Sequence, residues 1–180
     1  MLKRLRQAMT TGEYLLIYTA KDDPSSFCYG RILAVDEDYV ALYLISPEGA
    51  YDGILVKETG SVQRIESGGQ YDAKMKKLMQ GEQLPDWPWE TRSGSIAAQL
   101  LSMAAERRNV VSIEFWDSGL DNDIGLVKAV DEETATVTLM DAYGYPDGES
   151  LFRLDSITQI ACDGRDERNY WRLWQINGGQ

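Results

Sequence analysis

Histidine is absent from this chain of 180 residues. Without it there can be no Ser-His-Asp or Cys-His catalytic system, no histidine-based zinc site and none of the usual pH switches. Basic residues are also scarce, because 18 Lys and Arg face 29 Asp and Glu and leave a net charge of −11. A charge of that sign opposes the binding of phosphate backbones by bulk electrostatics. We therefore expect neither a His-dependent enzyme nor a general nucleic-acid-binding protein.

Cysteine and long apolar runs are equally scarce. The two cysteines, Cys28 and Cys162, are too few for a disulfide scaffold, and we expect both to be reduced core residues. The apolar run over residues 14–20 is too short to cross a bilayer and ends in charged residues without a signal-peptide cleavage site. These features predict a cytoplasmic protein with no membrane contact.

An internal repeat is the strongest positive signal. Residues 30–37 align with residues 125–132 at a shift of 95 positions, and both segments contain Ala-Val-Asp-Glu. The same shift aligns Asp52-Gly53 with Asp147-Gly148. A repeat of this length indicates two copies of one structural unit. We predict a first unit over residues 1–80, a linker rich in Pro and Trp over 81–95, and a second unit over 96–180.

Each unit has the pattern of a short helix, five short strands and a closing helix. In the second copy, Val111, Ile113 and Phe115 alternate with polar residues, which is typical of a half-buried antiparallel strand. Residues 36–38 and 131–133 are acidic and predict tight turns between the second and third strands. The predicted fold class is mainly β: two tandem five-stranded barrels of the Sm-like or SH3-like kind, each flanked by short helices.

The motifs of the unit resemble those of the Sm-like small barrels, whose first motif is Gly-x-Leu-x-x-Phe-Asp. The matching residues in the two copies are Gly30, Ile32, Val35 and Asp36, and Gly125, Val127, Val130 and Asp131. Residues 152–157 are similar to the second motif, with Leu154 where the family has Gly. The resemblance covers nearly all of both units, and an unrelated SH3-like barrel would show almost the same pattern.

The resemblance does not extend to the RNA-binding residues of that family. Its Asn position falls on Val40 or Ala41 in the first copy and on Ala135 or Thr136 in the second. Its Arg position is Glu58 in the first copy and Arg153 in the second. Neither copy has the amide that would bind a base, so the resemblance implies the fold without the family's RNA activity.

We find no catalytic constellation, cofactor motif or metal site in the sequence, and we expect a protein that is not an enzyme. Asp121, Asp123 and Glu132 are spaced like part of a calcium loop, but Leu126 occupies the position that requires glycine. We interpret this segment as a charged hairpin.

The leading hypothesis is a non-enzymatic binding or assembly module that acts through protein contacts, as a monomer or a small closed oligomer. Its motivation is the acidic field, of which residues 96–180 carry a net −8, and a surplus of aromatic side chains. The candidate interaction residues are Tyr39, Tyr43, Trp87, Trp89, Trp171 and Trp174. Sequence does not identify the protein partner.

The alternative hypothesis is RNA binding by an Sm-like protein through a non-standard surface. The candidate residues for it are Lys74, Lys76, Lys77 and Arg153. A solvated helix face is the simpler interpretation of the lysines, so this alternative is disfavoured. An acidic protein that masks a basic partner is a third hypothesis, which only the net charge supports.

One strand of the first copy is apolar on both faces. Residues 39–45 are Tyr-Val-Ala-Leu-Tyr-Leu-Ile, whereas the aligned strand has threonine at positions 134, 136 and 138. A strand that is apolar on both faces must be covered on both. A terminal helix, the Trp-containing linker, the second unit or a partner could provide that cover.

Overall fold

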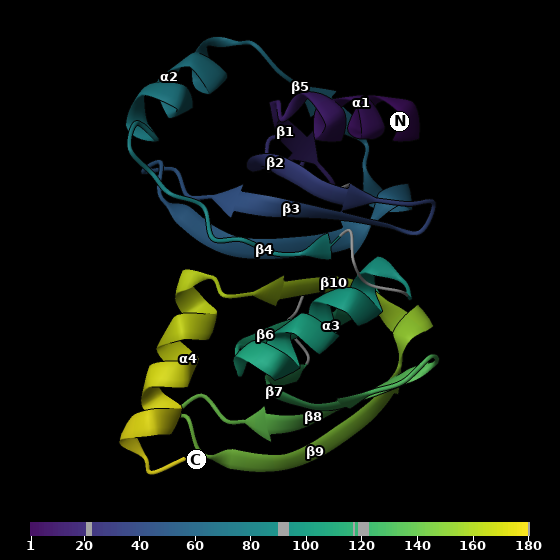
Figure 1. Cartoon of the computed structure of the whole chain (residues 1–180), viewed down its shortest axis with the longest axis vertical. Coiled ribbons are helices and arrows are strands. Elements are labelled where there is room, and N and C mark those ends of the chain that lie inside the picture. The colour runs from purple at the N-terminus through teal and green to yellow at the C-terminus, as the bar shows by residue number, and fades with distance from the viewer. Residues whose placement is uncertain (21–22, 90–93, 117, 119–122, 180) are drawn as a thin grey trace. The chain divides into compact units, whose positions relative to one another are not determined.

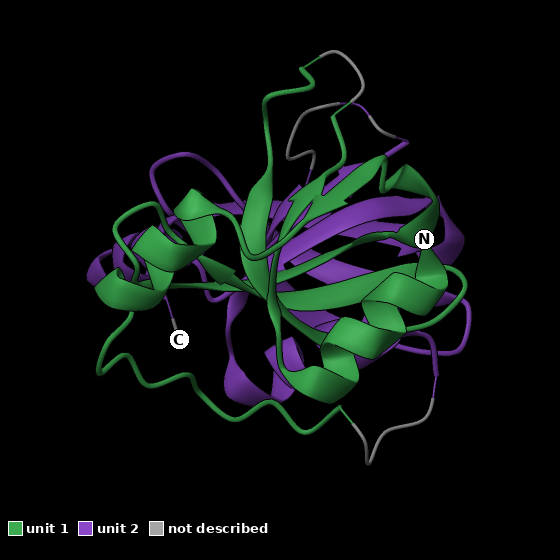
Figure 2. Ribbon diagram, turned by 90° about the horizontal axis from the view of Figure 1, so that it is seen from above, with its two compact units in different colours: residues 1–89 green, residues 90–180 purple. Residues whose placement is uncertain are grey.

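The structure is a computed structural model of the whole chain, and it describes residues 1–20, 23–89, 94–116, 118 and 123–179. The chain divides into two compact units, residues 1–89 and residues 90–180 (Figure 2). The described part contains ten strands and four helices. The prediction of a mainly β protein is confirmed.

Unit 1 is an antiparallel sheet with a helix before it and a helix after it in the chain. The strands are paired in the order β5-β1-β2-β3-β4. The first helix packs against β2 and the second against β1 (Figure 1). The elements are α1 (Leu2–Thr11), β1 (Tyr14–Tyr18), β2 (Cys28–Val35), β3 (Tyr39–Ile45), β4 (Tyr51–Glu58), β5 (Arg64–Glu66) and α2 (Gln70–Leu78).

Unit 2 repeats this plan. Its strands are paired in the order β10-β6-β7-β8-β9. Its first helix packs against β7 and β10, and its last helix packs against β6 (Figure 1). The elements are α3 (Ile96–Arg107), β6 (Val110–Phe115), β7 (Asp123–Val130), β8 (Thr134–Met140), β9 (Pro146–Arg153), β10 (Ile157–Cys162) and α4 (Arg165–Ile176).

The repeat in the sequence is also a repeat in the backbone. Strands β2, β3 and β4 correspond to β7, β8 and β9 at both ends under the same shift of 95 residues. The register agrees as well, since Gly30 pairs with Leu44 in unit 1 and Gly125 pairs with Leu139 in unit 2. Asp123, which the sequence places in a charged hairpin, is the first residue of β7, while Asp121 lies outside the described residues.

Two local features fix this shared register. A Cβ on Gly30 would lie 2.0 Å from the carbonyl oxygen of Tyr43, and one on Gly125 would lie 2.0 Å from that of Thr138. Only glycine permits so close an approach of two strands. The predicted acidic turns are present too, because Asp36 Oδ1 accepts the amide of Tyr39 at 2.7 Å and Asp131 Oδ1 accepts that of Thr134 at 2.7 Å. These hydrogen bonds lower the pKa of Asp131.

Neither sheet closes into a barrel. In the described residues β5 pairs with β1 alone, and β4 pairs with β3 within unit 1. The strand β5 spans only three residues, so it offers little length for a second pairing. The sequence predicts closed barrels, whereas each unit is an open five-stranded sheet.

The apolar strand β3 is covered from both sides. Tyr39, Ala41 and Tyr43 define what we call the outer face of the unit 1 sheet, and all three are buried. The hydroxyl of Tyr43 donates a hydrogen bond to the carbonyl of Pro85, and the amide of Tyr51 donates one to Glu82 Oε1 at 2.8 Å. The segment over residues 82–89 therefore belongs to unit 1 and contacts this face at Tyr43, rather than serving only as a linker.

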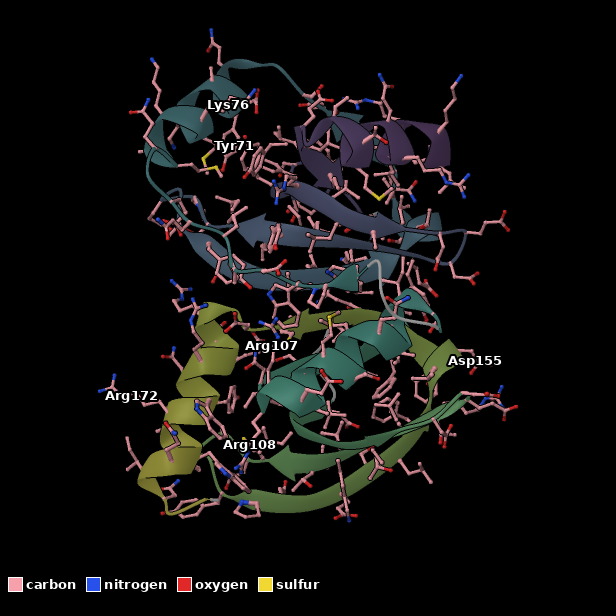
Figure 3. All side chains as sticks on the ribbon, viewed as in Figure 1. Tyr71, Lys76, Arg107, Arg108, Asp155 and Arg172 are labelled. Atoms are coloured by element: carbon pink, nitrogen blue, oxygen red, sulfur yellow. The ribbon has the colours of Figure 1, made fainter. Side chains whose placement is uncertain are left out.

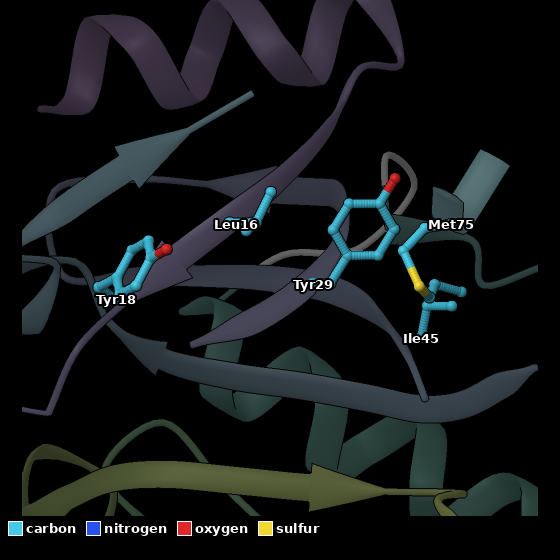
Figure 4. Close-up of a cluster of buried hydrophobic side chains, with 5 residues drawn as sticks. All are labelled: Leu16, Tyr18, Tyr29, Ile45 and Met75. Carbon is cyan, nitrogen blue, oxygen red and sulfur yellow. The ribbon is translucent and has the colours of Figure 1, made fainter. Parts of the chain in front are cut away.

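Helix α2 packs over a core of unit 1 that is rich in aromatic rings. Leu16, Tyr18, Tyr29, Ile45 and Met75 form one buried cluster between the sheet and α2 (Figure 4). Aromatic and sulfur-containing side chains fill such an irregular space well. The cluster fixes α2 on the strands.

Candidate protein-interaction surface

The aromatic residues that the sequence suggests as an interaction surface are mostly interior. Five of the six are at most 7% exposed: Tyr39, Tyr43, Trp87, Trp89 and Trp174. Trp171 is half-buried against the core of unit 2. Burial of the large apolar rings accounts for their presence, because each removes a large area from water. They do not form an exposed binding surface.

The basic residues of the RNA alternative are separated and partly neutralised. Lys76 Nζ lies 2.7 Å from Asp72 Oδ2, and Lys74 lies over the ring of Tyr71 (Figure 3). Arg153 donates two hydrogen bonds to Asp155, at 2.9 and 2.5 Å. Lys77 is exposed in the last turn of α2. The three lysines lie in unit 1 and Arg153 lies in unit 2, so no single surface within a unit joins them.

Each unit has a buried carboxylate in the first turn of its last helix. In unit 1, Asp72 is 3% exposed and accepts a hydrogen bond from the hydroxyl of Tyr29 at 2.7 Å. The ion pair with Lys76 supplies its counter-charge. Buried charge is tolerated only where it is paired and hydrogen-bonded. This arrangement fixes α2 to the sheet and leaves no unsatisfied oxygen for a ligand.

The equivalent carboxylate of unit 2 is held differently. Glu167 is 6% exposed and accepts hydrogen bonds from the Ser112 hydroxyl at 2.6 Å and the Gly164 amide at 3.0 Å. Burial raises the pKa of Glu167, while the bond from Ser112 opposes that rise. Both carboxylates are structural, because all of their contacts are to the helix and strands that they join.

The remaining chemistry of the described residues is sparse. Cys28 is half-buried and Cys162 is buried, and both are free thiols whose pKa is raised by burial. In the described part of the chain no three His, Cys, Asp or Glu residues are grouped so that they could hold a metal ion. No described helix is long and apolar enough to cross a membrane.

Of the six large apolar side chains that are exposed in the described part of unit 2, four lie where the β8–β9 turn meets α4, and the other two are Trp116 and Leu151. We call these four the apolar patch. The exposed fractions of its four members are 74%, 52%, 37% and 70% for Tyr143, Tyr145, Leu173 and Ile176. Exposed apolar side chains that cluster in this way mark interaction sites more often than isolated ones.

Local geometry holds the patch together. The amides of Tyr143 and Tyr145 both donate to Asp141 Oδ1 at 2.9 Å, which fixes the turn. Gly144 adopts a φ of +80°, and a Cβ there would lie 2.5 Å from the Cβ of Leu173, so the turn sits directly on the helix. Ile176 lies three residues after Leu173 and therefore on the same side of α4. The carbonyl of Tyr143 accepts a bond from Asn177 Nδ2 at 2.8 Å.

The repeat shows that the patch is specific to unit 2. At the shift of 95 residues, Tyr143, Tyr145 and Ile176 align with Glu48, Ala50 and Gly81, and only Leu173 has an apolar equivalent of its size, Leu78. The turn has the same backbone in both units, because Gly49 and Gly144 both have positive φ and both pack on the following helix. The aromatic side chains are therefore not needed to make the turn.

These patch residues were not among the candidates from sequence. Their signal was two tyrosines at positions that align with a Glu and an Ala in the other copy. Detecting it requires a comparison of exposed positions between copies, which in turn requires knowing which positions are exposed. No protein-family model, curated protein or solved structure matches this chain.

Proposed function

We propose that this protein is a non-enzymatic binding module of two tandem Sm-like units, and that a protein partner docks on the apolar patch of unit 2. The observation that carries the proposal is the cluster of exposed Tyr143, Leu173 and Ile176 on a turn and helix that their unit 1 equivalents build without aromatics. Aromatic and aliphatic side chains grouped on a rigid surface are the usual anchors of protein interfaces.

The Sm-like part of the proposal rests on strand order and motif position. Both units have a short helix followed by five antiparallel strands in an equivalent order. The motif glycines, Gly30 and Gly125, lie where the second and third strands approach most closely. The open sheets are compatible with this topology, since the proposal concerns the order and bending of the strands.

RNA binding at the family's usual site receives no support from the geometry. Val40 and Ala41 are fully buried and Ala135 is 1% exposed, so these positions cannot present a hydrogen-bonding group to a base, and the half-buried Thr136 has a hydroxyl in place of the family's amide. The Arg153 guanidinium is already bonded to Asp155. A protein partner is therefore the better proposal.

The test is affinity capture from native lysate with three forms of the full chain, each with and without ribonuclease. The double variant Tyr143→Ser/Ile176→Ser removes the patch. The variant Leu151→Ser is the matched control, because Leu151 is 71% exposed on β9 and lies outside the patch. Both changes are on the surface and should alter stability by less than about 0.5 kcal/mol.

We expect a set of proteins that wild type and Leu151→Ser retain, that the double variant loses and that ribonuclease does not release. Identical capture by all three forms would contradict the assignment of the patch. Release by ribonuclease would instead favour the RNA hypothesis.

A further inference from the structure

Charge is unevenly distributed within unit 2. Two of its basic residues lie on strands and are paired with acids: Lys128 with Glu149 at 2.5 Å, and Arg153 with Asp155. Five more of its described basic residues are arginines at the end of α3 and on α4, namely Arg107, Arg108, Arg165, Arg168 and Arg172. Arg165 and Arg168 lie 3.7 and 3.8 Å from the carboxylates of Asp166 and Asp163. In Figure 3, Arg108 and Arg172 lie on the α4 side of the unit and Asp155 lies on the opposite side. Most of the described arginines of this acidic unit thus lie on its α4 side.

Arg172 borders the apolar patch, and Arg108 lies near Trp171 of the same helix. Arg172 precedes Leu173 in α4 and lies one helical turn before Ile176. Arg168 lies one turn before Arg172 and donates a hydrogen bond to the carbonyl of Asp163 at 2.5 Å. Among the described residues neither Arg108 nor Arg172 makes an ion pair with an acidic side chain. The guanidinium of Arg172 beside the patch and that of Arg108 near Trp171 are thus available to a carboxylate.

Arg108 is held in a conformation that favours glycine. It ends α3 with a φ of 56°, whereas α1 ends with Gly12 at a φ of 67°. A side chain costs free energy in this left-handed region. The guanidinium lies 5.8 Å from the ring centroid of Trp171 on α4. Because a strained residue points to a role for its side chain, Arg108 is better explained by what it binds than by the turn it makes.

We infer that the partner presents an acidic amphipathic segment, with apolar side chains against the apolar patch and carboxylates against Arg108 and Arg172. This inference rests on the proposed function and names the chemistry of its partner. A basic partner would be drawn by the net charge of −11. At the contact itself the nearest charges decide, because charges beyond about 8 Å are screened at physiological salt.

The apolar side chains favour protein over nucleic acid as the occupant. Leu173 and Ile176 are aliphatic and offer no ring for stacking a base, so a base could use only the two tyrosines of the patch, whereas an apolar peptide face can contact all four side chains. Arginine forms bidentate pairs with carboxylates as readily as with phosphates. A segment that combines apolar and acidic side chains matches both features of the surface.

The test measures binding of synthetic amphipathic helical peptides to the full chain by fluorescence anisotropy. One peptide has leucine on one face and glutamate on the other, the second has lysine in place of glutamate, and a single-stranded oligouridine is the third probe. The variants are Arg108→Glu/Arg172→Glu for the arginines and Tyr143→Ser/Ile176→Ser for the patch. The matched control is Lys128→Glu/Arg153→Glu, which changes the net charge equally on another surface.

We expect the glutamate peptide to bind at least about tenfold more tightly than the lysine peptide. Arg108→Glu/Arg172→Glu and Tyr143→Ser/Ile176→Ser should each weaken binding of the glutamate peptide at least about tenfold. The affinity of the control Lys128→Glu/Arg153→Glu should stay within about threefold of wild type. A variant Arg108→Gly, which suits the left-handed backbone, should weaken binding without any loss of thermal stability, and so separates binding from folding.

Three outcomes would overturn the inference, and they differ in what they say of the proposed function. Tighter binding of the lysine peptide that still depends on Tyr143 and Ile176 would leave the patch as a protein site with a basic partner. Binding of both peptides that ignores Tyr143 and Ile176 would reject the patch as well. Oligouridine that binds more tightly than the glutamate peptide, through Arg108 and Arg172, would assign the surface to nucleic acid.

Discussion

The outer faces of the two sheets differ in chemistry although the strands that form them share one register. In unit 1 the face carries Tyr39, Ala41 and Tyr43, all of which are buried, and Tyr43 bonds to Pro85 in the segment over residues 82–89. In unit 2 the equivalent positions are threonines, which are only half-buried. The backbone plan does not require an apolar outer face. Whether a strand position is apolar is decided by what covers it.

The comparison extends to the turns and helices. The equivalents of Tyr143 and Ile176 in unit 1 are Glu48 and Gly81, whereas unit 2 leaves both apolar side chains exposed, with Arg172 nearby in α4. Two copies of one fold therefore differ in surface chemistry. A shared fold does not by itself imply a shared function.

The largest expected effect tests whether side chains on the outer face stabilise unit 1 more than they stabilise unit 2. Tyr43→Ala removes a buried ring that packs on Tyr51 and bonds to Pro85, and should lower the free energy of unfolding by about 3–5 kcal/mol. Thr138→Ala, at the aligned position of unit 2, should cost less than about 1 kcal/mol. Urea denaturation followed by tryptophan fluorescence and circular dichroism measures both.

Tyr43→Phe is the control for that pair. It keeps the ring and removes only the hydroxyl that bonds to Pro85, so it should cost about 1 kcal/mol. Equal losses for Tyr43→Ala and Thr138→Ala would show that the two faces contribute alike and would contradict the comparison.

Much of the shared backbone could be predicted from sequence, because the signals for it are local. The Asp-containing turns, the alternating strands and Gly30 with Gly125 lie within a few residues of the structure they determine. The mainly β class follows from them. The open sheets do not, because closure depends on whether distant strands pair, and the three-residue strand β5 gives no signal of that.

The surfaces could not be predicted, because they depend on contacts between residues far apart in the chain. The burial of Tyr43 and Trp87 depends on how residues 82–89 cross the sheet, which composition alone describes only as a linker. Arg108 comes close to Trp171 of α4 only when α3 and α4 are placed on the same sheet. The net charge summed over residues 96–180 does not show where the individual arginines lie.

The second prediction compares the buried carboxylates of the last helices. Asp72→Asn loses the ion pair with Lys76 and weakens the bond from Tyr29, and should cost about 1–2 kcal/mol. Glu167→Gln can still accept from Gly164 and can donate to the Ser112 oxygen, so it should cause no loss at neutral pH.

Glu167 should also make the stability of the protein depend on pH. Burial raises the pKa of Glu167 in the folded protein, so its protonated form favours folding. This contribution is complete below the unfolded pKa of about 4.3 and is lost as pH rises through the higher folded value. Glu167→Gln should remove that decline, which chemical denaturation between about pH 4 and pH 8 would detect. A steeper decline in the variant would contradict the assignment.

The smallest effect concerns the ends of the first helices, where the two units use different residues in one backbone conformation. Gly12 ends α1 and nothing lies within 4 Å of where its Cβ would be, so Gly12→Ala should cost only the backbone term of about 1 kcal/mol. Arg108→Gly should gain a similar backbone free energy and lose part of that gain because the contact with Trp171 is removed. The expected net change is a gain in stability of about 0–1 kcal/mol. Thermal unfolding at fixed protein concentration measures both changes. A clear loss of stability in Arg108→Gly would show that the arginine is retained for the fold, and would remove the strain argument for its role in binding.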